Sequence, residues 1–163
     1  MKISHIQARV AGFLLAAFVI GVDQWSKAFV VYIATHSAFP LTLLPFFNLV
    51  LAWNSGISFG MFARLQEWMP RVIIFTTSLV VVMLVIWLLR AKERATIVAL
   101  GFVIGGAVGN IIDRMRLGAV ADFLDFHIGH YHWPAFNVAD SAIFIGVVIL
   151  ILTGIMRPSE DKS

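Results

Sequence analysis

Two aspartates have the chemistry and the surroundings expected of an acid–base pair. Asp122 lies in the stretch Val120–Phe126, and Asp140 ends the stretch Phe136–Asp140. They flank a loop that joins two strongly apolar segments, so both carboxyls should lie near one face of a bilayer. Charged groups at membrane depth are rare, and they usually pair, line a wet cavity or react. We therefore interpret Asp122 and Asp140 as a catalytic pair.

A second interpretation of Asp140 remains open. Asn137 followed by an acid at the third helical position is close to a capping box, because an acid there can bind the free N–H groups of a helix start. The local sequence does not choose between a helix cap and a catalytic acid.

The composition predicts an integral membrane protein. The chain has 163 residues, of which 60% are hydrophobic and 13% charged, and its mean hydropathy is +0.92. A soluble domain of this size does not need so much apolar surface. The net charge of +3 comes without a long basic run, which argues against nucleic acid as a partner. The chain has no cysteine, which excludes a disulfide, a thiol nucleophile and a thiolate metal site.

Four apolar segments predict a mainly α fold with four transmembrane helices in a single membrane domain, 1–163. The first resembles a secretory signal, but three further segments and the lack of a small-residue cleavage site favour a retained anchor. The helices are predicted at about 10–33, 71–89, 95–112 and 138–156, with extracytoplasmic loops at about 34–69 and 113–137.

The first long loop is predicted to form a small β-sheet at the membrane surface. Pro40 and Pro45 forbid a continuous helix, and Phe46–Trp53 is rich in residues that favour strands before the turn-like Asn54–Gly56. Aromatic residues of this kind gather at the membrane–water interface. The residues expected in such a belt are Trp53, Trp68, Phe46, Phe47, Phe59 and Phe62.

Polar residues also interrupt the predicted helices. Asp23 and Lys27 lie four residues apart, on one face of the first helix. They form either part of a site or an internal ion pair whose lysine reaches towards the surface. Asn110, Asp113 and Arg114 share a face at the end of the third helix, as a hydrated helix end or as groups that orient the neighbouring loop. Glycines four apart in the same helix predict a close packing seam; they are Gly101, Gly105 and Gly109.

Two other hydrolase chemistries are disfavoured. The pentapeptide Gly56–Gly60 matches the G-x-S-x-G pattern of serine hydrolases, but no apolar segment carries a histidine to complete a triad. Asp122 or Asp125 could join loop histidines in a metal site, although the spacing is not a standard one. These histidines are His127, His130 and His132.

The distribution of basic residues predicts the orientation, because the side richer in Lys and Arg faces the cytoplasm. With four helices, both termini share one side. The basic residues there are Lys2, Arg9, Arg90, Lys92, Arg94, Arg157 and Lys162, and those opposite are Arg64, Arg71, Arg114 and Arg116. Both termini are therefore predicted to be cytoplasmic, with both acids at the outer face.

These residues together resemble the lipoprotein signal peptidases, the type II signal peptidase family of bacteria, along nearly the whole chain. Ser58 departs from the alanine more often expected there. The matching stretches are Asp23–Lys27, Asn54–Gly60, Gly109–Arg114, Val120–Phe123 and Phe136–Asp140, in this order.

The resemblance implies a membrane-embedded aspartic endopeptidase of the bacterial inner membrane with Asp122 and Asp140 as its dyad. It implies a prolipoprotein substrate with a diacylglyceryl cysteine, cleaved on the amino side of that cysteine, contact with membrane lipid, and inhibition by globomycin-type peptides. No metal or organic cofactor is implied. By the same resemblance, Asp23 and Lys27 support the substrate-binding region, with Gln24 and Asp113 as further candidates, and the site is shaped by Asn54, Gly56, Asn110, Arg114 and Asn137.

Two rival functions follow from the same residues. A transporter or channel would use Asp23, Asp113 or Asp122 in a proton path. The chain shows no internal repeat, and its acids gather at one surface instead of lining a crossing. A metal-dependent membrane hydrolase would use the histidines instead.

Overall fold

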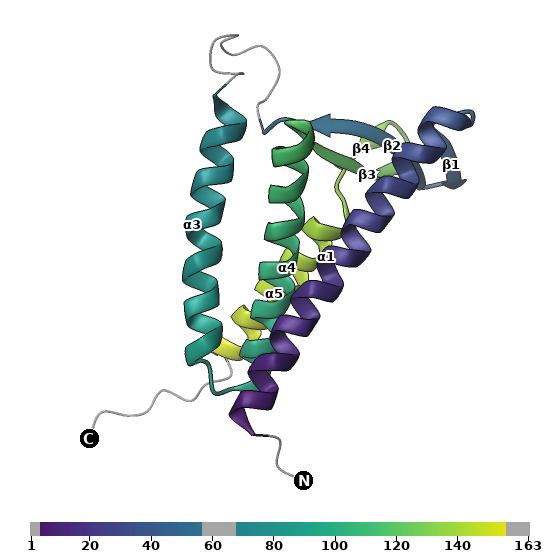
Figure 1. The fold of residues 1–163 in the computed structure, drawn as a ribbon. Coiled ribbons are helices and arrows are strands. Elements are labelled where there is room, and N and C mark those ends of the chain that lie inside the picture. Colours follow the sequence, from purple (N-terminus) through teal and green to yellow (C-terminus); the bar gives the residue numbers. More distant parts are fainter. Residues whose placement is uncertain (1–3, 57–67, 156–163) are drawn as a thin grey trace.

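The computed structural model describes residues 4–56 and 68–155. They form four long helices and one antiparallel sheet (Figure 1). The helices are α1 (His5–His36), α3 (Met69–Arg90), α4 (Arg94–Leu117) and α5 (Val138–Ile155). The strands are β1 (Leu41–Leu44), β2 (Phe47–Asn54), β3 (Val120–Ile128) and β4 (Tyr131–His132). All four helices are long and apolar enough to cross a membrane, which confirms the predicted fold class.

Helix α4 is the centre of the bundle. In its most apolar window 67% of the residues are buried, against at most 22% in the other three helices. Its glycines allow this packing: a Cβ on Gly101 would lie 2.7 Å from the Gly12 carbonyl oxygen of α1, and one on Gly105 would lie 2.8 Å from that of Ala16. The predicted glycine seam is therefore confirmed, and it faces α1.

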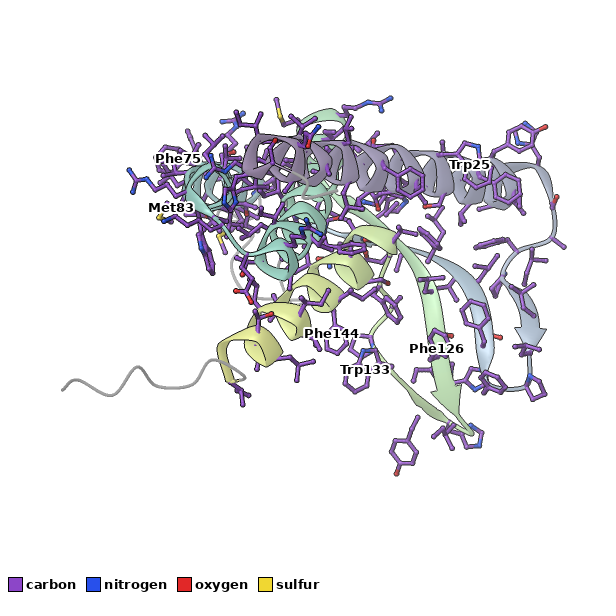
Figure 2. The ribbon with its side chains drawn as sticks, turned by 90° about the horizontal axis from the view of Figure 1, so that it is seen from below. Trp25, Phe75, Met83, Phe126, Trp133 and Phe144 are labelled. Carbon is purple, nitrogen blue, oxygen red and sulfur yellow. The ribbon has the colours of Figure 1, made fainter. Side chains whose placement is uncertain are left out.

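The outer surfaces of the helices are apolar. Phe75 and Met83 on α3 point away from the bundle and are 66% and 60% exposed (Figure 2). Exposing apolar side chains of this size to water is unfavourable in free energy, whereas lipid tails solvate them well. The exposed surface therefore agrees with a bilayer as the solvent.

Two helices extend beyond their predicted ends. Helix α1 begins at His5 because Ser4 and Gln7 form a capping box. Helix α4 continues to Leu117, so the predicted end near residue 112 is wrong. It stops at Gly118, whose φ of 75° suits a glycine cap. The apolar sequence pattern ends before the helix does, so the polar residues Asp113 and Arg114 lie inside α4.

Half of the sheet comes from a region predicted as loop. The strand order is β1-β2-β3-β4, and β2 pairs antiparallel with β3, with Ala52 opposite Asp122 and Asn54 opposite Val120. The segment 113–137 is thus not an irregular loop. Its strand is stabilised by pairing with β2, which is distant in sequence, so local composition alone did not reveal it.

The sheet lies at the end of the bundle opposite the start of α1 and the end of α5 (Figure 1). Helices α4 and α5 meet β3 at this end, since α4 runs into β3 and α5 follows β4. Polar residues from a helix end, a helix start and a strand can therefore converge there.

Candidate active site

Asp122 is buried in β3 and hydrogen-bonded by two amides. It is 3% exposed. Asn54 donates from Nδ2 to Oδ2 at 2.9 Å, and Asn137 donates from Nδ2 to Oδ1 at 2.6 Å. Burial raises the pKa of Asp122, the Asn54 hydrogen bond opposes this, and the charge of Asp140 raises it further. The charge of Asp140 therefore acts on the ionisation of Asp122.

Asp140 lies in the first turn of α5. Its Oδ2 accepts from the Asn137 backbone N–H at 3.2 Å, while its own N–H donates to Asn137 Oδ1 at 3.0 Å. This reciprocal pattern is a capping box, as the second interpretation predicted. Asp140 has a further contact that capping does not require, because Asn110 of α4 donates from Nδ2 to Oδ1 at 2.8 Å.

Neighbouring donors fix the orientation of the asparagine amides. Gly56, at φ +80°, donates its N–H to Asn54 Oδ1 at 2.9 Å, which leaves Asn54 Nδ2 to face Asp122. Asn137 is fully buried, and the Asp140 N–H occupies its oxygen in the same way. The amide nitrogens must therefore donate to the carboxylates.

Arg114 supplies a cation beside the two acids. It is half-buried in α4, and Nη1 makes a long contact of 3.5 Å to the Asn110 carbonyl oxygen. Its charge is attracted by Asp140, Asp122 and Asp113. Within the described part of the chain, Arg114 Nε is buried without a hydrogen-bond partner. This N–H is a free donor next to the acid pair.

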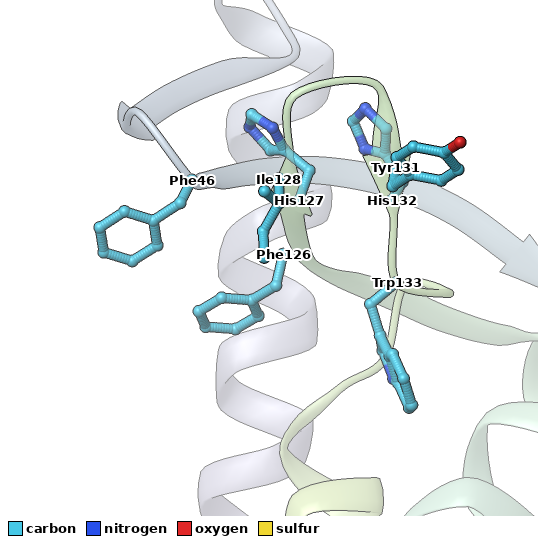
Figure 3. A pocket seen from close by; sticks show the side chains of 7 residues that line it. All are labelled: Phe46, Phe126, His127, Ile128, Tyr131, His132 and Trp133. Atoms are coloured by element: carbon cyan, nitrogen blue, oxygen red, sulfur yellow. The ribbon is translucent and has the colours of Figure 1, made fainter.

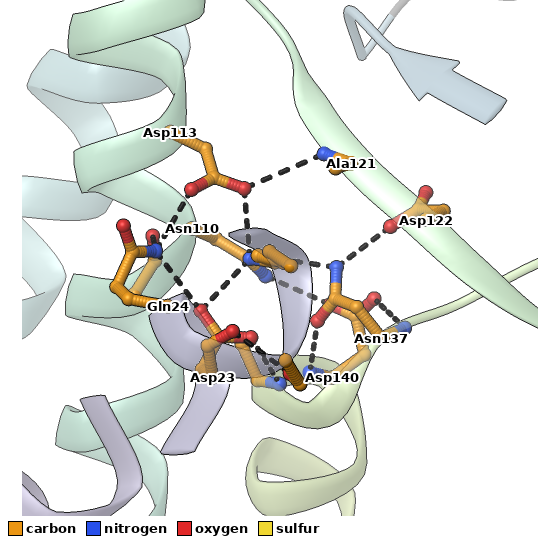
Figure 4. Close-up of polar contacts among 12 residues, drawn as sticks. Asp23, Gln24, Asn110, Asp113, Ala121, Asp122, Asn137 and Asp140 are labelled. Carbon is orange, nitrogen blue, oxygen red and sulfur yellow. Dashed lines mark hydrogen bonds and ion pairs between the residues drawn. The ribbon is translucent and has the colours of Figure 1, made fainter. Parts of the chain in front are cut away.

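A second polar cluster lies beside the first (Figure 4). Lys27 Nζ lies 2.9 Å from Asp23 Oδ2 and 2.9 Å from Asp113 Oδ2. Gln24 donates from Nε2 to Asp113 Oδ1 at 2.8 Å. The predicted ion pair of Asp23 with Lys27 is therefore present, but the Lys27 side chain is only 5% exposed, so the expectation that it reaches the surface is wrong. The intramembrane charges pair with each other, which agrees with the cost of leaving them isolated.

Gly109 belongs to this cluster as well as to the packing seam. A Cβ on Gly109 would lie 2.6 Å from Asp23 Oδ2. The glycine spacing identified the close helix packing, but it did not indicate that one glycine makes room for a carboxylate.

The histidines lie away from both acids. His132 Nδ1 is 2.9 Å from Asp125 Oδ1 on the neighbouring strand, and the His127 ring stacks on that of His132. Burial raises the pKa of Asp125, but hydrogen bonds from Asn48 and His132 outweigh it, so the net shift is downward. Residues 4–56 and 68–155 contain no group of three or more His, Cys, Asp or Glu that could hold a metal ion.

Two apolar pockets lie at this end of the molecule, one beside the tip of β3 and one beside the start of α5. The larger, of about 660 Å³, is next to the histidines at the far end of β3, with Phe46, Phe126 and Trp133 in its wall (Figure 3). The smaller, of about 450 Å³, includes Asp140 and is lined along α5 by Phe144 and Ile145. Of these two pockets, only the smaller has one of the two acids, Asp140, in its wall, so it is the pocket next to the candidate catalytic groups.

The structure thus gathers most of the predicted site residues around Asp122 and Asp140, and places Asp23 and Lys27 in the cluster beside them. The prediction missed two backbone N–H groups, those of Ala121 and Ala139, which bind Asp113 and Asp23. Each alanine directly precedes one of the paired acids, and this adjacency is the only signal that the sequence offered.

Comparison with known proteins identifies the family. The family model described as signal peptidase (SPase) II matches residues 15–156. The chain is 44% identical to a lipoprotein signal peptidase from Beijerinckia indica, covering 88% of this chain and 87% of that protein. It is 46% identical to the one from Syntrophotalea carbinolica, covering 85% and 87%.

Solved structures agree with the sequence relatives. A bacterial membrane enzyme determined at 2.3 Å superposes with a TM-score of 0.76 at 30% identity, covering 94% of this chain and 92% of that one. A second, at 1.9 Å, gives 0.77 at 29% identity, covering 91% and 94%. Together with the polar site at the sheet end of the bundle, these matches show that the chain belongs to the signal peptidase II family.

Proposed function

We propose that this protein is an aspartic endopeptidase that removes the signal peptide from diacylglyceryl-modified prolipoproteins, cutting on the amino side of the lipidated cysteine. Membership of the signal peptidase II family indicates a protease that processes lipoproteins. The aspartic chemistry is supported by one observation above the others. Asn137 binds Asp122 through its side chain and Asp140 through its backbone, and so joins the two acids.

The mechanism follows from two carboxyls that share one proton. Like charges and burial both resist joint ionisation, so the pair retains a proton that an isolated carboxyl would lose. The ionised member accepts a proton from water, and the other donates its proton towards the scissile carbonyl oxygen. The positive charge of Arg114, which lies close enough to interact with both acids, would stabilise the negative charge that develops on that oxygen.

The site also meets the physical demand of the substrate. A signal peptide in hydrocarbon is a helix whose backbone is paired internally, so cleavage needs an unwound segment and water at one depth. Asp140 is half-buried at a helix start, where water can reach it, and Asn137 connects it to the buried Asp122. The apolar pocket at Asp140 continues along Phe144 of α5, a surface suited to an acyl chain or an apolar signal segment.

We propose that the active site faces outward from the bacterial inner membrane and that both termini are cytoplasmic. The excess of Lys and Arg on the terminal side supports this orientation. Aromatic side chains on the sheet and directly after it support an interfacial position, since Trp53 of β2 and Trp133, which follows β4, are 50% and 70% exposed. Phe59 and Phe62 of the predicted aromatic belt lie outside the described residues.

The direct test uses purified protein with a prolipoprotein prepared both with and without its diacylglyceryl group. The lipidated form should be cut to a product whose mass begins at the modified cysteine, and globomycin should block the reaction. Equal cleavage of the unlipidated form would contradict the proposed substrate. Cleavage at another bond would contradict the proposed position.

A further inference from the structure

The two segments that carry the acid pair begin alike. Both read Val-Ala-Asp, at residues 120–122 and 138–140. In each, the alanine N–H donates to a carboxylate from a transmembrane helix: Ala121 to Asp113 Oδ2 at 3.4 Å, and Ala139 to Asp23 Oδ1 at 2.9 Å. One carboxylate thus holds the backbone directly before Asp122, and another holds the backbone directly before Asp140.

Lys27 bridges the carboxylates of Asp23 and Asp113. Its Nζ is 2.9 Å from both Asp23 Oδ2 and Asp113 Oδ2, and it donates to Asn110 Oδ1 at 3.0 Å. An ammonium group has three N–H donors, so this set of partners uses all of them. All three N–H donors of Lys27 are therefore paired inside a buried site, where an unpaired charge would be costly.

The third contact extends the arrangement to Asp140 itself. With Lys27 at its oxygen, the Asn110 amide can present only its nitrogen to Asp140 Oδ1, which it reaches at 2.8 Å. Lys27 is therefore connected to the acid pair by three routes, through Asp113 to β3, through Asp23 to α5, and through Asn110 to the Asp140 carboxyl.

We propose that Lys27 is a positioning residue that sets the spacing and relative orientation of Asp122 and Asp140 by holding Asp113 and Asp23 together. This inference rests on the proposed function, because it concerns the geometry of the same acid pair. It differs from a role as counter-charge alone, which would need only a cation near the carboxylates. Positioning matters because a displacement of about 1 Å in a catalytic group can cost about a hundredfold in rate.

The first test measures catalysis by Lys27→Met, which keeps an unbranched apolar side chain and removes all three donors. We expect kcat to fall by roughly tenfold to a hundredfold while KM stays within about twofold, because the acids are displaced and substrate contacts remain. The matched control is Asp125→Asn, which removes a carboxylate from the same strand β3 outside this network. A folded Lys27→Met protein with unchanged kcat would overturn the proposal.

Lys27→Arg separates positioning from charge. It keeps a cation, but a planar guanidinium cannot reproduce three diverging bonds from one nitrogen. We expect kcat to stay low in this variant. Full activity would show that the charge alone is needed, and would overturn the proposal.

A distance measurement tests the geometry without relying on cleavage. Spin labels at Ile128→Cys on β3 and Phe144→Cys on α5 are specific, because the chain has no cysteine and both sites are exposed. Pulsed EPR should give a narrow distance distribution that broadens or shifts in Lys27→Met. An unchanged distance distribution in Lys27→Met would overturn the inference. If the distribution changes but the protein with Lys27 intact cleaves no prolipoprotein, only the proposed function is refuted. Should Lys27→Met not fold, Asp113→Asn removes the β3 connection and keeps the pair of Lys27 with Asp23, and the same results are expected.

Discussion

Asp140→Asn separates the helix cap that Asp140 forms in the structure from its proposed role as a member of the acid pair. The amide keeps the size of the carboxyl but can neither carry a charge nor accept a proton from water. We expect turnover to fall by on the order of a thousandfold, which is about 4 kcal/mol of transition-state stabilisation. Asp122→Asn should have an effect of similar size.

The expected cost in stability is smaller and follows from the contacts of Asp140. An amide has one acceptor oxygen, and the shorter bond from Asn110, at 2.8 Å, should retain it. The Asn137 N–H, now at 3.2 Å from the other oxygen, would then face an NH₂ group. Loss of this cap bond costs about 1 kcal/mol, and loss of a negative charge at a helix start costs about 0.3–1 kcal/mol more.

The assay compares cleavage rate and thermal unfolding of three variants in one detergent, with rates measured below every unfolding midpoint. Asp125→Asn is the control, since its carboxyl on β3 is bonded to Asn48 and His132 at a distance from the pair, and it should lose far less activity. A folded but inactive Asp140→Asn supports the acid pair. If that variant is destabilised yet cleaves at a normal rate, Asp140 is only a helix cap and the dyad is wrong.

Three further predictions concern topology, metal dependence and helix packing. Single cysteines at Lys92 and Gly129 should react with impermeant reagents from opposite sides of the inner membrane, Gly129 from outside; labelling from one side only would overturn the four-helix topology. The variants His127→Ala, His130→Ala and His132→Ala should each retain cleavage, and chelators should not inhibit the protein. A loss of cleavage that added zinc restores would instead favour a metal-dependent hydrolase. Gly109→Ala should lower activity because its Cβ would displace the Asp23 carboxylate, while Gly21→Ala, which meets nothing within 4 Å, should not; equal activity of the two would refute the close contact.

Hydropathy determined the membrane class and the number of spanning helices, because lipid requires long apolar segments whatever their neighbours are. The glycine spacing of α4 likewise predicted close packing, since small side chains at one helix face act locally. Asp122 and Asp140 were predicted as an acid pair for a similar reason, because a carboxylate beside an apolar segment is costly in any fold.

The tertiary structure decided what those residues contact. The strand β3 exists because β2 lies beside it, so residues 120–128 could not be distinguished from a loop by their own composition. The sequence placed Asp23 beside Lys27 but did not show whether Lys27 reached the surface or was buried, because its other two partners, Asp113 and Asn110, come from α4. The hydrogen bonds from Ala121 and Ala139 use backbone groups, which every residue except proline possesses, and only the folded chain shows which of them meet a carboxylate.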